Sequence, residues 1–196
     1  MHEALNRNLF LVKEHVGMFK AANNYDVYEP ETGRVVMHSR EPRLGGITKV
    51  LRFTEQKTLT PFDIRITTPD GEPLVRVTRG WAFIRSKVQV FDERDEYMGT
   101  FRQRLLSLGG AFDLIGPNDE VLCSLRGRWT SWNFRFLVGE AEVAHVTKKW
   151  AGVGRELFTS ADNYILEIDD DVPRDHPLRP LILAAVMCID MVLKEK

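Results

Sequence analysis

The chain has 196 residues, 43% of them hydrophobic, 28% charged and 10% aromatic, which excludes a disordered or low-complexity protein. Its 27 Lys and Arg against 28 Asp and Glu give a formal net charge of −1, which disfavours a nucleic-acid binder held by overall charge. The length is sufficient for one domain with a full core, and we expect residues 1–196 to form a single domain.

The N-terminal segment contains only a short apolar run, Leu9–Val12, which Lys13 ends. A secretory signal peptide needs about 7–15 apolar residues, so we predict none. Cys123 and Cys188 lie in apolar runs and indicate buried free thiols in a reducing compartment. These features predict a protein that is cytoplasmic or attached peripherally to a membrane.

A hairpin pattern then repeats along the chain. Three segments open with an aromatic residue, an aspartate and an aliphatic residue, at Tyr25, Phe62 and Phe112. Proline and other turn-forming residues follow each opening, and an apolar return segment comes next. Proline presets φ and glycine accepts positive φ, so these groups predict tight turns. The second and third copies run in register, with matches between Pro69 and Pro117, Leu74 and Leu122, and Val90 and Val138.

Residues 130–138 alternate between apolar and polar side chains, which predicts a half-buried antiparallel strand. The expected inner face holds Trp132, Phe134, Phe136 and Val138, and the outer face holds Ser131, Asn133 and Arg135. Many short strands at regular spacing are typical of a barrel or a sandwich. Three or four copies are few for a propeller, so we favour a closed barrel.

The last segment has no strand pattern, because residues 181–193 are apolar apart from Asp190. Pro180 suits a first helical turn. Thirteen helical residues span roughly 20 Å, whereas a bilayer core needs about 30 Å, and a carboxylate is costly in lipid. We therefore predict a central core helix over residues 178–194 with no transmembrane span, and a buried Asp190 that needs hydrogen bonds or a cationic partner.

Several motifs carry a family resemblance. The segments 148–152 and 155–164 resemble the phospholipid scramblase signature, and Cys188–Asp190 resembles the closing helix of that family. Residues 17–19 and 23–27 resemble the N-terminal motif of the family, and residues 102–108 are similar to a sequence motif of the LURP-one-related proteins. The resemblance implies a tubby-like, all-β fold with one helix: a closed antiparallel barrel of about twelve strands around a buried hydrophobic C-terminal helix.

The resemblance also implies a Ca²⁺ loop, whose positions here are Ser160, Asp162, Tyr164, Leu166, Ile168 and Asp171. Ca²⁺ takes oxygen ligands, and Leu166 and Ile168 offer no side-chain oxygen. Their period of two fits the core face of a strand better. We keep Ser160, Asp162 and Asp171 as the candidate Ca²⁺ ligands, with a solvated acidic loop at 169–171 as the alternative, and expect no other cofactor.

Basic residues gather in two stretches, 34–57 and 126–155, each with six Lys or Arg and two Glu. We expect barrel closure to bring them together into a patch for anionic phospholipid headgroups, and a solvated exterior is the alternative. The candidate headgroup ligands are Arg40, Arg43, Lys49, Arg52, Arg126, Arg128, Lys148 and Lys149.

No nucleophile with its base, P-loop or dinucleotide fingerprint is present in the sequence, so we expect no enzyme. The leading hypothesis is a soluble, non-enzymatic binding or scaffold module of the scramblase and LURP-one-related type. Its partner would be anionic phospholipid at the cytoplasmic membrane face, or another protein. The alternatives are Ca²⁺-dependent phospholipid scrambling and, least favoured, a nucleic-acid-binding module.

Overall fold

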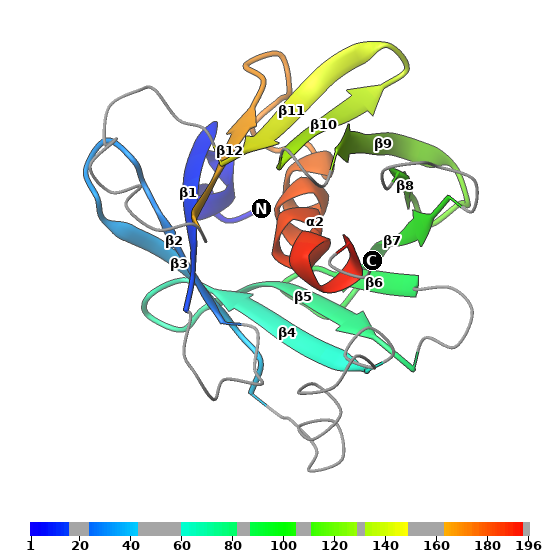
Figure 1. Cartoon of the computed structure of the whole chain (residues 1–196). Helices are drawn as coiled ribbons and strands as arrows, with labels where there is room; N and C mark the ends of the chain where they lie inside the picture. Colours follow the sequence, from blue (N-terminus) through cyan, green and yellow to red (C-terminus); the bar gives the residue numbers. More distant parts are fainter. Residues whose placement is uncertain are drawn as a thin grey trace.

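In the computed structural model the chain forms a closed barrel of twelve antiparallel strands around one helix (Figure 1). The structure describes residues 1–15, 24–42, 60–81, 87–104, 111–128, 132–148 and 163–193. The strands are β1 (Leu9–Glu14), β2 (Tyr25–Tyr28), β3 (Val35–Arg40), β4 (Phe62–Thr67), β5 (Pro73–Arg79), β6 (Lys87–Phe91), β7 (Tyr97–Gln103), β8 (Ala111–Ile115), β9 (Val121–Arg128), β10 (Asn133–Val138), β11 (Ala141–Thr147) and β12 (Asn163–Ile168). A short 3-10 helix, η1 (Glu3–Asn6), precedes β1, and helix α2 (Leu178–Leu193) follows β12.

Each strand pairs with the next one along the chain, and β1 closes the ring by pairing with β12. Closure leaves none of the twelve described strands with an unpaired edge. The tight turns after β2, β4, β6, β8 and β10 all lie at one end of the barrel, the hairpin end. Strands β1, β3 and β5 finish at the opposite end, the loop end.

The predicted hairpin repeat is confirmed, since its first two openings begin β2 and β4, the third is at the second residue of β8, and the predicted turns follow. The matched turn positions Gly71 and Asp119 both have positive φ, 91° and 64°, as a tight hairpin turn requires. The turn between β6 and β7 has the same backbone hydrogen bonds, from residue 92 to 96 and from 95 to 92. It contains no proline, so the sequence pattern did not identify it.

The predicted alternation is confirmed over most of β10, where Phe134 and Phe136 are fully buried while Asn133 and Arg135 are exposed. The prediction for Val138 is wrong, because this side chain is 45% exposed. A bulge between Phe136 and Leu137 shifts the pairing with β11. The extra residue of this bulge is Val143 of β11, so β10 gains no residue, and Val138 is exposed as the last residue of β10, beside the turn at residues 139–140.

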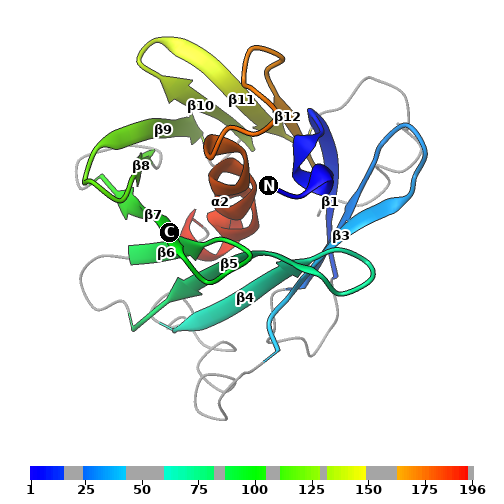
Figure 2. The ribbon, with the colours of Figure 1, turned by 180° about the vertical axis from the view of Figure 1, so that it is seen from behind.

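The central helix is confirmed, and both Figure 1 and Figure 2 show α2 in the middle of the ring of strands. It covers the predicted residues except Lys194, which lies outside the described part. Residues 178–189 are all buried, so the helix has no polar face in this stretch, as expected for a core helix. Each fully buried Leu or Ile stabilises the fold by about 1.5–3 kcal/mol relative to exposure.

Candidate functional site

The structure describes the side chains of three of the eight predicted headgroup ligands. Arg40 ends β3, Arg126 lies in β9 and Lys148 follows β11. Four of the others, Arg43, Lys49, Arg52 and Lys149, lie outside the described residues. The backbone of Arg128 is described but its side chain is not.

The two basic stretches lie on opposite walls where the structure describes them. Strands β3 and β9 stand half-way round the ring from each other, and Figure 1 shows them on opposite sides of α2. Arg40 and Arg126 therefore do not belong to one patch. In a barrel of consecutive hairpins, separation along the chain becomes separation around the circumference, so closure does not bring the described members of the two stretches together.

One wall instead carries an arginine row (Arg40, Arg65 and Arg76), two members of which the sequence analysis did not identify. In the strand registers Arg40 lies opposite Arg65, and Arg65 lies opposite Arg76. Residues opposite each other share a face, and the neighbours Ser39, Ile64 and Val77 are buried on the inner face. The arginines therefore point outward, across roughly 10 Å at the usual strand spacing.

The two outer arginines are held by carboxylates. The Nε and Nη2 atoms of Arg76 each donate to a different oxygen of Asp63 at 2.9 Å, and Nη1 lies 3.3 Å from Asp95. The hydrogen bonds that Arg76 donates to Asp63 raise the pKa of Arg76, against the effect of burial. Arg40 donates to Asp26 at 2.5 Å and to the backbone oxygen of Tyr25 at 2.6 Å.

Arg65 differs from both neighbours. It is exposed, and among the described residues no carboxylate pairs with it. Like charges placed opposite each other destabilise a sheet. The central arginine thus lies between two arginines that are paired with carboxylates, while its own guanidinium donors are open to solvent and could bind a phosphate group.

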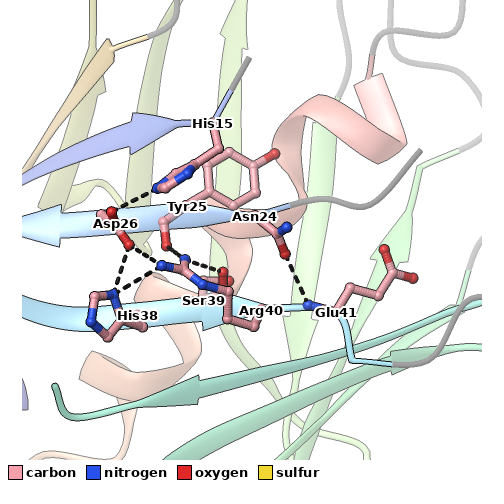
Figure 3. Close-up of polar contacts among 8 residues, drawn as sticks. All are labelled: His15, Asn24, Tyr25, Asp26, His38, Ser39, Arg40 and Glu41. Carbon is pink, nitrogen blue, oxygen red and sulfur yellow. Dashed lines mark hydrogen bonds and ion pairs between the residues drawn. The ribbon is translucent and has the colours of Figure 1, made fainter. Parts of the chain in front are cut away.

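Beside the row lies a second group of polar side chains, the Asp26 cluster (His15, Asp26, His38 and Arg40), which Figure 3 shows in close-up. One oxygen of Asp26 lies 2.6 Å from Nε2 of His15, and the other lies 2.7 Å from Nδ1 of His38. The Asp26 side chain is only 12% exposed, against 36% for His15 and 31% for His38.

Asp26 is ionised over the whole physiological range. Burial by itself would raise its pKa, but hydrogen bonds from Arg40, His38 and His15 outweigh burial and lower the pKa to about 2. The repeated aspartates share this role, because Asp63 pairs with Arg76 and Asp113 pairs with Arg104 at 2.9 Å. The aspartate of the hairpin repeat is therefore an outer-face partner for arginine, which the sequence repeat alone did not show.

Lys148 has aromatic contacts that occupy its ammonium group. Its Nζ lies 3.9 Å from the centroid of the Trp132 ring and 5.0 Å from that of Tyr164. The two rings stack at 4.8 Å. A cation over an aromatic face is attracted by the ring quadrupole, so Lys148 is less available to a headgroup than Arg65.

Three positions of the implied Ca²⁺ loop belong to the core. Tyr164, Leu166 and Ile168 are each at most 2% exposed on the inner face of β12, which confirms the strand interpretation of this segment. Ser160 and Asp162 lie outside the described residues. Asp171 is exposed, and its N–H donates to the Asp169 carboxylate at 2.8 Å. Within the described part of the chain, no three His, Cys, Asp or Glu residues are placed to hold a metal ion.

The acidic run lines one side of an open groove of about 410 Å³ over β1, β11 and β12. Its polar side chains come from Asn8, Glu142, His145, Glu167, Asp169 and Asp170. Asn8 donates to Asp170 across the groove, and His145 contacts Asn133 at 3.0 Å. This groove lies away from the arginine row.

Two buried arginines were not identified from the sequence. Arg179, 1% exposed, lies in the first turn of α2 and donates to backbone oxygens of Arg7, Val172 and Pro173 and to Oδ1 of Asn8. Burial lowers its pKa. Arg79, 4% exposed, donates to the backbone oxygen of Thr60 at 2.7 Å. The side chain of Asp190 lies outside the described residues, so its predicted burial stays a prediction.

The fold defines the class as a twelve-stranded antiparallel barrel built around its own C-terminal helix. The sequence profile of the Scramblase family matches residues 8–196, and the chain belongs to that family. A solved X-ray structure of a protein from Arabidopsis thaliana has the same fold, with a TM-score of 0.56 and 15% identity over 94% of this chain and 91% of the other.

Curated relatives match more locally. Phospholipid scramblase 1 of Mus musculus is 28% identical over 134 residues, which cover 68% of this chain and 35% of the relative. Phospholipid scramblase 1 of Homo sapiens is 26% identical over 133 residues, with 68% and 36% covered. Phospholipid scramblase 2 of Bos taurus is 26% identical over 133 residues, with 68% and 39% covered. The match thus spans little more than a third of the length of these relatives. Among the described residues, no helix has the length and apolar character needed to cross a bilayer.

Proposed function

We propose that this protein is a non-enzymatic binding module that holds anionic phospholipid headgroups at the cytoplasmic face of a membrane through its arginine row. The observation that carries the proposal is Arg65, which is exposed, has Arg40 and Arg76 opposite it, and has no carboxylate partner among the described residues. A phosphate bound there would accept hydrogen bonds from a guanidinium fork that has no carboxylate partner in the described part of the chain.

Two further observations support a phospholipid as the ligand. The curated relatives are named phospholipid scramblases. The chain between β3 and β4, which carry Arg40 and Arg65, adds Arg43, Lys49, Arg52 and Lys57 against Glu41 and Glu55. Basic residues near an anionic leaflet each contribute about 1 kcal/mol to binding. The basic stretch 34–57 therefore supports the β3–β5 wall as the lipid-binding surface.

Flotation with vesicles tests the proposal. The chain is mixed with vesicles of phosphatidylcholine alone, or with about one third phosphatidylglycerol, and we expect flotation only with the anionic lipid. Arg65→Gln should weaken binding about fivefold, since one charge near the leaflet is lost. The matched control is Arg126→Gln on the opposite wall, where an exposed arginine also lies in a strand.

The control variant separates the two basic stretches. Unchanged binding by Arg126→Gln together with weaker binding by Arg65→Gln supports the arginine row. The reverse result would move the site to the β9 wall and overturn the proposal, as would equal flotation with both kinds of vesicle.

The names of the relatives favour scrambling itself as a second candidate. The test uses vesicles with fluorescent phospholipid in both leaflets, reconstituted with the chain, and measures the lipid that an external reductant bleaches with and without Ca²⁺. Bleaching beyond the outer leaflet supports scrambling, and bleaching equal to that of protein-free vesicles removes this candidate.

A further inference from the structure

We propose that the Asp26 cluster makes headgroup binding at the arginine row acid-dependent: His15 and His38 add positive charge beside Arg40 and Arg65 when they gain protons. The inference rests on the proposed function and concerns the regulation of the same site. It is carried by the two partly exposed imidazoles that flank one buried carboxylate in Figure 3.

The carboxylate fixes the proton on each neutral imidazole. Asp26 is ionised and can only accept hydrogen bonds, so the proton of His15 lies on Nε2. Nδ1 of His38 lies 2.7 Å from Asp26 and 3.1 Å from Nη2 of Arg40, which can only donate, and the shorter contact with the carboxylate favours the proton on Nδ1. Arg40 donates to the same oxygen as His38. The opposite ring nitrogens, Nδ1 of His15 and Nε2 of His38, then carry lone pairs.

The cluster has no net charge while both histidines are neutral, because Arg40 balances Asp26. The registers give the other groups of this wall: Lys13 lies opposite Asp26, Arg65 lies opposite Arg40, and Thr67 lies opposite His38. Six charged or titratable groups surround the histidines: Lys13 and Glu14 from β1, Asp26 and Tyr28 from β2, Arg40 from β3 and Arg65 from β4. The next strand, β12, places the neutral Asn163 opposite Lys13.

Protonation changes both the charge and the hydrogen-bonding of this wall. An imidazole ordinarily gains its second proton between about pH 8 and 5. Each histidine then adds one positive charge and turns a lone pair into an N–H donor that can reach a phosphate oxygen. Because the carboxylate of Asp26 stays ionised, a gain of both protons would change the cluster from neutral to a net charge of +2. At about fivefold in affinity for each basic group near an anionic surface, the expected gain is about 25-fold.

Vesicle binding measured against pH tests the inference. The full chain is titrated with vesicles containing about one third phosphatidylglycerol, at about pH 7.5 and 5.5 and at constant ionic strength. This lipid is a phosphodiester, so its own charge does not change in that range. The variants are the double substitution His15→Gln with His38→Gln, which keeps N–H donors for Asp26 without a titrating group, and the control His145→Gln on β11, which removes a histidine three strands away from β2 around the ring.

The expected result is tighter binding at the lower pH for the wild type and for His145→Gln, and a pH-independent affinity for the double variant. A double variant that keeps the acid gain overturns the inference, as does a wild type that binds equally at both pH values; either result leaves headgroup binding intact. Absence of binding at every pH contradicts the proposed function itself. If circular dichroism shows that the double variant is unfolded, His38→Gln alone should show a gain of about fivefold instead.

Discussion

Arg179 gives the sharpest test of how the barrel holds its helix. This side chain is 1% exposed and donates hydrogen bonds to four acceptors: Nη1 to the backbone oxygen of Arg7 at 2.9 Å, Nη2 to Oδ1 of Asn8 and the oxygen of Val172 at 2.7 Å each, and Nε to the oxygen of Pro173 at 2.8 Å. It thereby ties the first turn of α2 to the segment before β1 and to the loop after β12.

Substitution Arg179→Met keeps most of the volume but leaves these four acceptors without their donor. A hydrogen bond from a charged donor contributes about 1.5–3 kcal/mol, and returning the buried guanidinium to water recovers several kcal/mol. We expect a net loss of about 3–5 kcal/mol in the free energy of unfolding. For a chain of this length each kcal/mol shifts Tm by about 2–4 °C, so Tm should fall by about 10 °C.

The assay is thermal unfolding followed by circular dichroism at neutral pH. The matched control is Arg174→Met, which removes an exposed arginine from the same loop and should change Tm by less than about 2 °C. If the two variants had the same Tm, Arg179 would not connect α2 to the N-terminal segment in the way described.

Three further predictions follow from buried groups. Asp26→Asn should lower the free energy of unfolding by about 2 kcal/mol above pH 4, because the pKa of Asp26 is lowered from 3.8 to about 2 in the fold. This contribution exists only while Asp26 is ionised, so the difference in Tm between variant and wild type should shrink as the pH falls from 4 to 2. Gly99→Ala should cost about 1–3 kcal/mol in urea unfolding, since its Cβ would lie 2.6 Å from the Ile115 oxygen; Gly80→Ala, with open space, is the control. Burial raises the pKa of both thiols, that of Cys123 to about 12, so Ellman's reagent should label them only after unfolding.

The sequence by itself determined the kind of fold. Period-two alternation, proline-containing turns and an apolar segment too short for a bilayer predicted strands wrapped around a core helix, and α2 lies there. These signals are local, because each depends on residues a few positions apart. The prediction for Val138 was wrong because β10 ends at this residue, beside the turn to β11, and the point where the strand ends depends on its pairing with β11, which no local pattern contains.

Only the tertiary structure decided which charges share a wall. Arg65 and Arg76 each stand between apolar residues in their strands, and nothing in either segment shows that they lie opposite each other and Arg40. The same holds for Asp26, whose partners come from β3 and from the residue after β1. Strand register brings together residues that are far apart in the chain, whereas the charge composition of a segment counts only residues that are close in the sequence. The sequence therefore predicted basic character near residues 34–57, and the barrel alone selected the arginine row within the β3–β5 wall.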